Sequence, residues 1–178
     1  AALWVIALGL ISGPTYASEA SDPTSPPASI AKGALLDEKG IIFPIVEDLP
    51  FGRIVTTPCA LEIVLGKGRY LDRVDIVLDP GHGGPETGSV GANGLVERDL
   101  NLAVALLAEQ ELEALGHSVE LTRRNDLHMP IRQRAAIVNS LSPRAFVSIH
   151  HNGGALRRSN DPGTETFHQV NSTESRRL

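Results

Sequence analysis

The sequence predicts an α/β fold, a three-layer sandwich in which flanking helices cover a mostly parallel central sheet. Two observations favour this class. From Val74 onward, short aliphatic runs typical of strands alternate with longer stretches of helical spacing. The first run, residues 75–78, ends abruptly in a glycine-rich turn at residues 79–84. Because open α/β sheets usually place functional groups at the carboxyl ends of their strands, this turn is the first candidate for a site.

The elements of this region follow from the pattern in chain order. Residues 95–115 form the first predicted helix, which Gly116 ends as a left-handed cap. Its apolar residues recur at helical spacing and make one apolar stripe: Leu100, Val104, Leu107, Ala108, Leu112 and Leu115. The remaining predicted elements are a strand at 118–122, a helix at 129–140 with Pro130 in its first turn, and strands at 145–150 and 164–169.

The N-terminal residues 1–17 are predicted to be the remnant of a secretory signal peptide. Residues 1–11 are almost wholly apolar but too short to span a bilayer, and small residues follow around a cleavage site near Ala17 or Ala20. A buried N-terminal helix is the alternative, which two glycines and a proline in this segment disfavour. We therefore expect an exported protein without a stable membrane anchor.

Three further segments complete the expected organisation. Residues 18–29, rich in Ser, Pro and Ala, are expected to be a disordered linker. Residues 30–73 hold short apolar runs broken by Pro and Gly, which predicts a small β-rich lead-in that carries no chemistry of its own. Residues 74–178 form the main domain. Since the chain lacks an initial Met and stops as a helix begins near Ser172, we expect truncation at both ends, with this domain incomplete at its C-terminus.

Composition excludes several classes of partner and site. A net charge of −5 and an aromatic content of 4% argue against nucleic-acid binding. Cys59 is the single cysteine, so a disulfide within the chain and a Cys-rich zinc site are both excluded. We interpret Cys59 as a small buried residue, with a half-cystine whose partner lies outside the chain as the alternative. We expect the protein to be a monomer.

Three residues suggest a metal site, namely His82, Glu97 and His150. His82 lies in the glycine-rich turn, His150 closes the strand at 145–150, and Glu97 starts the first helix. Right-handed crossovers bring the carboxyl ends of parallel strands to one edge of a sheet, so the three side chains can converge there. Two imidazoles and a carboxylate with an open fourth position are the ligand set of a hydrolytic zinc site.

Spacing alone leaves simpler interpretations open. His82 could cap a turn, Glu97 could be an ordinary acid that suits the start of a helix dipole, and His150 could be a core histidine. The HExxH pattern of the common metalloproteases is absent. A phosphate cradle is another interpretation of the turn, but the turn has no Lys and the helix begins well downstream.

Six motifs in a fixed order carry a resemblance to a known family: DPGHGGPETGSVG, GLVERDLNL, LTRRND, IRQRAAIVN, FVSIHHNGG and GTETF. From about Val74 to its end, the chain resembles the zinc-dependent N-acetylmuramoyl-L-alanine amidases of the amidase-3 type. The resemblance implies hydrolysis of the amide between the lactyl group of N-acetylmuramic acid and the L-alanine of the peptidoglycan stem peptide. It also implies Zn²⁺ as cofactor, peptidoglycan as partner and secretion to the cell envelope, either the periplasm or the extracellular cell wall.

The resemblance assigns the ligands position by position. His82 matches the histidine of the family's DPGHGG turn, Glu97 the glutamate of its G-x-x-E-[KR]-D segment, and His150 the histidine of its S-I-H-x-N strand end. Glu86 falls where the family has an acid that is not a ligand. Alternation along a strand sends the side chain of His151 away from that of His150. His151 is expected either to line the pocket and help hold substrate or to be a plain exposed polar residue.

Other matching positions are predicted to be structural. Asp79 and Asn152 are expected to orient the ligands or brace the loops. Arg123 and Asp126 are expected to pair and fix the turn after the second strand. Arg134 and Asn139 lie on the second predicted helix, where a solvated helix face or an edge hydrogen bond is the simpler interpretation. Glu165 lies on the predicted strand at 164–169, from which it could reach the cleft.

One departure from the family pattern leaves two functional hypotheses. The family has a further glutamate on a late strand, taken to be the general base, and no segment here matches it. The expected catalytic Glu therefore lies beyond Leu178, and the substrate-binding residues are unknown. The leading hypothesis is a zinc-dependent amidase. The present chain is then a fragment of that enzyme, which can be inactive because it lacks this base. The alternative is a non-catalytic peptidoglycan-binding or regulatory module that retains the amidase fold.

Overall fold

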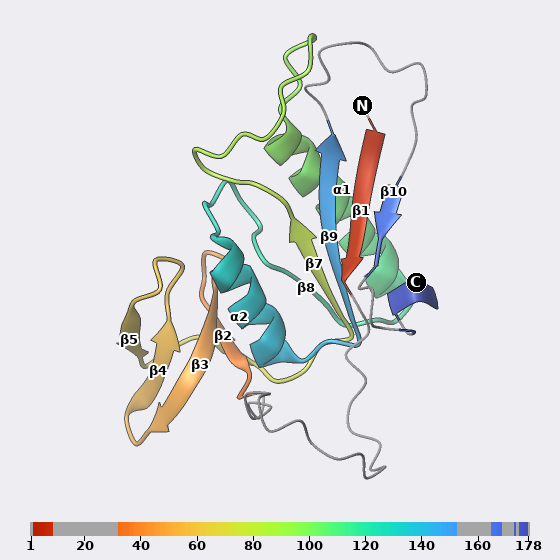
Figure 1. Cartoon of the computed structure of the whole chain (residues 1–178). Helices are drawn as coiled ribbons and strands as arrows, with labels where there is room; N and C mark the ends of the chain where they lie inside the picture. Colours follow the sequence, from red (N-terminus) through yellow and green to blue (C-terminus); the bar gives the residue numbers. More distant parts are fainter. Residues whose placement is uncertain (1, 9–31, 153–164, 169–172, 174, 178) are drawn as a thin grey trace, which may run out of the picture.

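The computed structural model of the protein describes residues 2–8, 32–152, 165–168, 173 and 175–177. This part of the chain forms two five-stranded sheets, two α-helices and a short 3-10 turn at Ser175–Arg177 (Figure 1). The α/β class predicted from the sequence is confirmed. The predicted linker at 18–29 and Ser172, near which a helix was predicted to begin, lie outside the described residues.

The central sheet has the strand order β10-β1-β9-β7-β8. Its strands are β1 (Ala2–Leu8), β7 (Ile76–Pro80), β8 (Val119–Leu121), β9 (Ala145–Asn152) and β10 (Glu165–Phe167). β7 pairs in parallel with both β8 and β9, whereas β1 pairs antiparallel with β9 and in parallel with β10.

The expectation of a mostly parallel central sheet is therefore corrected to a mixed sheet. β7, β8 and β9 run in one direction, while β1 and β10 run in the other. Parallel neighbours need a long crossover connection, usually a helix, and the sequence has a helical pattern after β7 and after β8 but none between β9 and β10. A strand that follows without a crossover helix returns antiparallel.

β1 comes from the segment interpreted as a signal-peptide remnant. Ala2–Leu8 lies between β9 and β10, and residues 1 and 9–17 lie outside the described residues. A short apolar run suits a buried strand as well as the hydrophobic core of an export signal. The signal-peptide interpretation stays a prediction.

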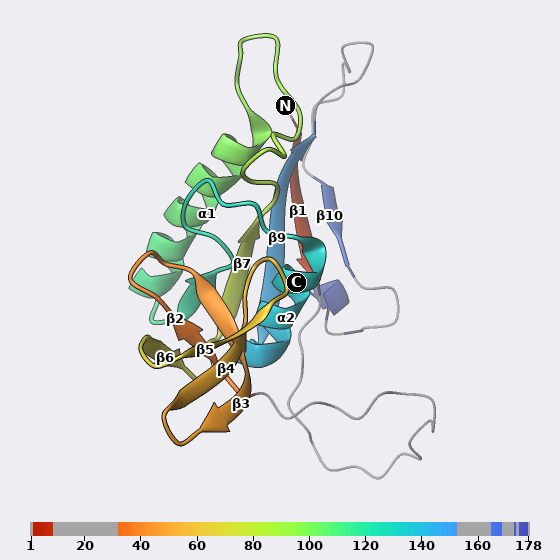
Figure 2. The same ribbon diagram turned by 90° about the vertical axis from the view of Figure 1, so that its left-hand side faces the viewer.

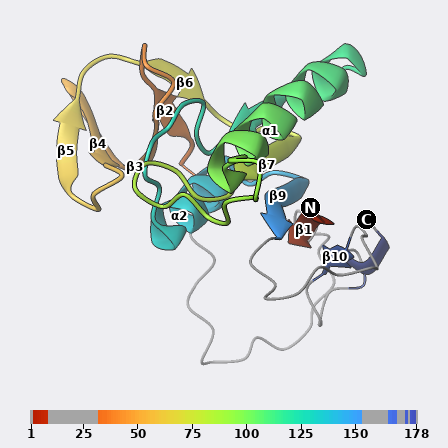
Figure 3. The same cartoon turned by 90° about the horizontal axis from the view of Figure 1, so that it is seen from above.

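The lead-in forms the second sheet, which is antiparallel throughout with the order β5-β4-β3-β2-β6. Its strands are β2 (Ala34–Leu36), β3 (Ile42–Leu49), β4 (Gly52–Thr56), β5 (Glu62–Leu65) and β6 (Arg69–Leu71). The β-rich character predicted for this segment is observed, while the predicted domain boundaries stay a prediction. Figure 3 shows this sheet at one side of the molecule and β10 at the other.

Two helices flank the central sheet on opposite faces (Figure 2): α1 (Glu97–Ala114) and α2 (Ile131–Leu141). Alternation along β7 explains the arrangement, because Leu78 joins the apolar cluster that includes Ala105 of α1. Its neighbour Val77 points the other way and joins the cluster that includes Ile137 of α2. Among the described residues, no helix combines the length and apolar character needed to cross a membrane.

The side of α1 that is buried differs from the predicted stripe. Leu107 and Leu115 are 62% and 75% exposed, so the predicted apolar stripe does not coincide with the buried side of the helix. The most deeply buried line of the helix runs through Glu97, Asn101, Ala105 and Glu109, spaced four residues apart. Glu97, Asn101 and Glu109 can be buried because they have polar partners elsewhere in the fold. The periodicity of apolar residues cannot reveal such partners.

Cys59 is free and exposed, so the expected buried position was also wrong. It lies in the turn that joins β4 to β5, where the backbone N–H of Ala60 donates to the carbonyl of Thr57 (2.8 Å). A tight turn between antiparallel strands directs its residues to solvent, which outweighs the usual preference of cysteine for the interior.

The lead-in and the main domain share one apolar cluster. Ala34, Ile42 and Leu71 of the second sheet pack with Val77 of the central sheet and with residues of and next to α2: Met129, Ile137, Val138 and Leu141. Polar contacts join the same parts, among them an ion pair between Arg69 and Glu120 at 2.6 Å. The two sheets are therefore expected to unfold together.

Replacing Leu71 with Ala should destabilise the whole described fold. Leu71 is 4% exposed in the shared cluster, and truncation of a buried leucine typically costs about 2–5 kcal/mol. Leu61→Ala, at a leucine of the same segment that is 64% exposed, is the matched control and should cost far less. Urea unfolding followed by circular dichroism measures both. Two separate transitions, with Leu71→Ala shifting only one, would contradict the shared core.

Candidate metal centre

The structure brings His82, Glu97 and His150 together at one edge of the central sheet. One ligand atom from each side chain lies within 4.8 Å of the other two. Oε1 of Glu97 is 3.1 Å from Nε2 of His82 and 3.1 Å from Nδ1 of His150. Figure 1 shows why they meet: β7 and β9 end at the same edge of the sheet, and α1 begins there. The predicted convergence is observed.

The two imidazoles face each other across this edge. Their ring centroids are 4.8 Å apart with an interplanar angle of 79°. The side chains of His82 and His150 are 26% and 28% exposed, whereas that of Glu97 is 6% exposed. The cluster therefore has a buried carboxylate at its base and two nitrogen ligands that solvent can reach.

Two glycines make room for these ligands. A Cβ added at Gly81 would lie 2.2 Å from the ring of His150, and one added at Gly88 would lie 2.6 Å from Cδ2 of His82 and 2.7 Å from Oε2 of Glu97. Gly88 also has φ +66°, a conformation that side chains rarely adopt. His82 itself has φ +63°, which is uncommon for a residue other than glycine. The turn thus holds a ligand in an unfavourable backbone conformation, with no space for larger neighbours.

Glu97 is an anion held by several donors. Burial raises its pKa, but the donors around it outweigh burial and lower the pKa to about 2. The N–H of Ser89 donates to Oε2 at 2.8 Å and the N–H of His151 to Oε1 at 3.1 Å, while the rings of His150 and His82 add to the same effect. At neutral pH this carboxylate is therefore ionised, as a metal ligand must be.

His151 lies beside the cluster without joining it. It is 8% exposed, and its Nδ1 is 2.6 Å from Oδ1 of Asn101 on α1. The amide nitrogen of Asn101 donates to the carbonyl of Gly81 (3.1 Å), so Oδ1 is the acceptor and we assign a proton to Nδ1 of His151. Burial is the main cause that lowers the pKa of His151. The plain exposed interpretation of His151 was wrong.

Arg134 and Arg123 are buried beneath the turn. Arg134 is 7% exposed and donates to the carbonyls of Pro80 (3.0 Å) and His82 (2.7 Å), so the interpretation as a solvated face was wrong, while the predicted structural role is observed. Arg123 is 1% exposed and donates to Pro80 and Gly81, each at 2.9 Å. Burial and the nearby guanidinium of Arg134 lower the pKa of Arg123 to about 10.

The expected pair of Arg123 and Asp126 was also wrong, because each has other partners among the described residues. A carboxylate oxygen of Asp126 accepts the N–H of Gly84 at 2.6 Å, and the other lies 3.5 Å from Arg98. Both Arg123 and Asp126 still fix this part of the fold, but they do so by holding the glycine-rich turn rather than each other.

Asp79 was predicted either to orient the ligands or to brace the loops. Its contacts brace the end of β7. It forms a buried ion pair with Arg134, and its carboxylate accepts hydrogen bonds from the hydroxyls of Thr122 (2.5 Å) and Ser148 (2.8 Å). These contacts tie β7 to the end of β8, to β9 and to α2. One carboxylate thus holds residues of three other parts of the fold.

Other predicted residues do not join the cluster. Glu86 is exposed and lies 3.9 Å from Nδ1 of His128, in keeping with a position that is not a ligand. Glu165 is exposed on β10, two strands away from β9, and Asn139 is exposed on α2. Asn152 ends β9, but its side chain lies outside the description.

Sequence reasoning missed Asn101, which links the turn, α1 and His151. The signal was available, because Asn101 lies four residues after Glu97 and hence on the same side of a helix. It also missed Ser89, whose contribution to the site is a backbone N–H that no side-chain pattern reports.

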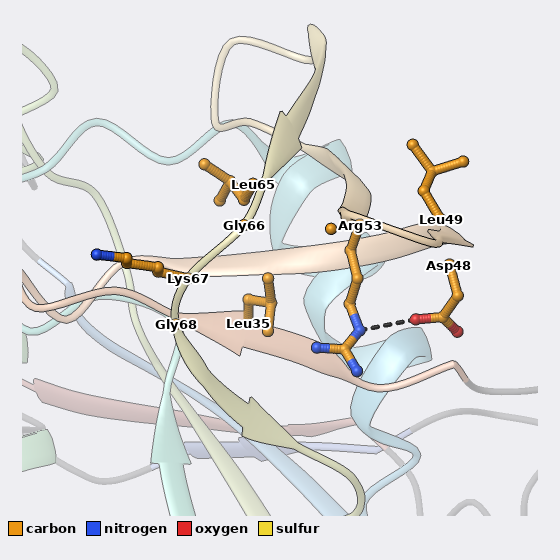
Figure 4. A pocket seen from close by; sticks show the side chains of 9 residues that line it. Leu35, Asp48, Leu49, Arg53, Leu65, Gly66, Lys67 and Gly68 are labelled. Atoms are coloured by element: carbon orange, nitrogen blue, oxygen red, sulfur yellow. Dashed lines mark hydrogen bonds and ion pairs between the residues drawn. The ribbon is translucent and has the colours of Figure 1, made fainter.

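A separate hollow of about 190 Å³ lies on the second sheet (Figure 4). It contains Arg53, which pairs with Asp48 at 2.7 Å and lies over the ring of Tyr70 at 5.0 Å. None of the three cluster residues lines it. The hollow is therefore not part of the candidate metal centre.

Fold and cluster together define an α/β protein with a candidate hydrolytic metal centre. The sequence model of the amidase-3 family, N-acetylmuramoyl-L-alanine amidase, matches residues 76–178. The chain belongs to this family, which confirms the resemblance drawn from the six motifs.

Several relatives share this similarity. N-acetylmuramoyl-L-alanine amidase AmiC of Neisseria meningitidis serogroup B is 41% identical over 85 residues, which cover 48% of this chain and 20% of the relative. The uncharacterised protein YqiI of Bacillus subtilis is 36% identical over 129 residues, which cover 70% of this chain and 57% of the relative. Among solved structures, the amidase AmiC2 of Nostoc punctiforme has 37% identity and a TM-score of 0.45, with 47% of each chain covered. The chain thus spans less than two thirds of each of these relatives.

Replacing Gly88 with Ala should impair metal binding. The added Cβ would meet His82 and Glu97 at less than 3 Å and force the two side chains apart. We expect the affinity for Zn²⁺, measured by competition with a chromogenic chelator, to fall about tenfold or more. Gly94→Ala is the control, because Gly94 has φ +79° but nothing within 4 Å of an added Cβ. Equal affinities of the two variants would show that crowding at Gly88 does not matter.

Proposed function

We propose that this protein hydrolyses the amide bond between N-acetylmuramic acid and L-alanine in peptidoglycan, with Zn²⁺ held by His82, Glu97 and His150. The observation that carries the proposal is the meeting of three ligand atoms within 4.8 Å in a chain of the amidase-3 family. Residues far apart in the sequence supply two imidazoles and one carboxylate, the ligand set of catalytic zinc sites.

The residues present fit a zinc ion. The carboxylate is ionised and oriented by donors other than the two rings, so its charge is already in place before a cation binds. Both imidazoles have an exposed side, which leaves an approach for substrate. The glycines at 81 and 88 keep the space between the ligands clear of side chains.

When bound, Zn²⁺ supplies a Lewis acid that polarises a carbonyl and lowers the pKa of water. The chain's own residues hold the ligands in place. Ser89 and His151 fix the Glu97 carboxylate through their backbone N–H groups, and Asn101 links the turn to α1. These contacts keep the three ligands at the exposed edge, where a peptidoglycan strand can reach them.

Proton transfer to the departing amine needs a further group. Within the described residues, Glu97 is the single carboxylate of the cluster, and it serves as a ligand. We propose that the general base is a glutamate beyond Leu178. Loss of a general base typically lowers a rate by roughly 10²–10⁴, so peptide release is to be tested with a protein that contains this glutamate.

The substrate sets the location. Peptidoglycan lies outside the cytoplasmic membrane, so we propose secretion to the cell envelope, either the periplasm or the extracellular wall. The apolar start of the chain supports export. We further propose a monomer without a stable membrane anchor.

A non-catalytic peptidoglycan-binding or regulatory module is the second candidate. The observation in its favour is the lack of a second carboxylate in the described cluster. Incubation of the protein that contains the proposed general base with purified cell-wall sacculi separates the two candidates. Sedimentation with the wall and no release of peptides that begin with L-alanine would favour the module, whereas release of such peptides would favour the amidase.

Replacing either His82 or His150 with Ala should remove bound zinc and any peptide release. Each change deletes one of three ligands and leaves a site that holds the ion too weakly to retain it. Zinc content measured by plasma emission spectrometry and peptide release measured by chromatography report the two effects. His117→Ala is the control, since His117 is exposed on the loop before β8. Full zinc content and unchanged peptide release in both ligand variants would refute the assignment.

A further inference from the structure

Three successive backbone carbonyls in the glycine-rich turn, those of Pro80, Gly81 and His82, point away from the metal cluster and into the protein. Each accepts at least one hydrogen bond from a buried side chain. The donors are Arg123, which follows β8, and Arg134 on α2. Neither arginine has a role in the proposed chemistry: Arg134 contacts the cluster only through the backbone carbonyl of His82, and the contacts of Arg123 are to the carbonyls of neighbouring residues.

We infer that Arg123 and Arg134 are positioning residues, which set the imidazole of His82 for metal binding by holding the carbonyls of this turn. The inference rests on the proposed role of the cluster as a zinc site. It concerns residues that act through His82 rather than on substrate.

The contacts of Arg123 are all directed to backbone. Its Nε donates to Pro80 and its Nη2 to Gly81, both at 2.9 Å. The same guanidinium donates to the carbonyls of Arg98 (2.8 Å) and Asn125 (3.0 Å). One planar guanidinium group therefore fixes the glycine-rich turn relative to the first turn of α1 and to the loop after β8. The ammonium group of a lysine, on its flexible side chain, cannot do this as well.

Arg134 holds the turn from the other side. Its Nη1 reaches the carbonyl of Pro80 and its Nη2 that of His82, while Nε donates to Met129 at 2.8 Å. An ion pair with Asp79 anchors the guanidinium. The carbonyl of Pro80 is thus shared by both arginines, and the peptide units on each side of Gly81 have fixed orientations.

The turn needs such fixing because its sequence does not favour one conformation. Gly81, Gly83 and Gly84 give the backbone wide freedom, and His82 has to adopt φ +63°. An arginine that holds the carbonyl of His82 stabilises this conformation over the alternatives. Two buried guanidinium groups with one carboxylate between them are costly to the fold, which favours a role for them at the site.

The neighbour of Arg123 is a matched control. Arg124 is also an arginine in the segment after β8, but its guanidinium binds Glu109 at 2.6 and 2.9 Å and Glu120 at 3.1 Å. None of these contacts involves the turn. Arg123→Lys and Arg124→Lys each remove a guanidinium group, at adjacent positions. Only Arg123→Lys removes hydrogen bonds to the carbonyls of the turn.

The test compares Zn²⁺ affinity and the absorption spectrum of the Co²⁺-loaded protein for wild type, Arg123→Lys and Arg124→Lys, with thermal unfolding of each metal-free protein as a check on folding. We expect Arg123→Lys to bind Zn²⁺ about 10–100-fold more weakly and to shift the Co²⁺ absorption bands, because the ligand geometry changes. Arg124→Lys should leave affinity and spectrum as in wild type.

Arg134→Lys keeps a positive charge beside Asp79 and loses the forked contact to Pro80 and His82, so it repeats the test if Arg123→Lys does not fold. Wild-type affinity and spectrum in the folded arginine variants would overturn the inference. Weaker binding in Arg123→Lys, in a protein that releases no peptide from sacculi, would support the inference and count against the amidase. A wild-type protein that takes up no Zn²⁺ would overturn both.

Discussion

The buried carboxylate of Glu97 is the constraint on which the rest of the structure depends. An isolated ionised carboxylate is very costly to bury, so the fold must supply donors or a cation at this point. It supplies N–H groups from the loop before α1 and from β9, and two imidazoles, one from the turn after β7 and one from β9, complete the surroundings. The first turn of α1, the ends of two strands and the glycine-rich turn are thereby tied to one anion. A bound cation would stabilise the same arrangement, and it would thereby couple metal binding to folding.

The packing of α1 shows how the fold combines structure with the site. Along its most buried line, Glu97 serves the cluster, Asn101 binds Gly81 and His151, Ala105 packs on the sheet, and Glu109 pairs with Arg124. Along this line, an apolar contact at Ala105 lies between polar contacts on either side. The leucines that flank this line fill the sides of the interface or remain in solvent, as Leu107 does.

This arrangement explains which features could be predicted from the sequence. The order of strands and helices from Ile76 onward follows from local periodicity, and the meeting of His82, Glu97 and His150 follows from the handedness of crossovers; both predictions hold in the structure. The direction of β10 and the burial of Arg134 depend on partners that are distant in the sequence. A charged side chain is exposed far more often than buried, so an arginine whose donors are satisfied by backbone carbonyls contradicts any prediction from residue type alone.

The same contacts give the lead-in sheet a place in the organisation of the site. Its residues Ala34, Ile42 and Leu71 complete the apolar cluster on which α2 rests, and the amide of Gln133 on that helix donates to the carbonyl of Thr56 at 3.2 Å. The next residue, Arg134, reaches the carbonyl of His82. The second sheet contains none of the three cluster residues, yet it supports the helix from which the glycine-rich turn is held. Since interiors are close-packed, a shift of that helix would be felt at the turn, and the lead-in is therefore part of the scaffold of the site rather than a spacer before it.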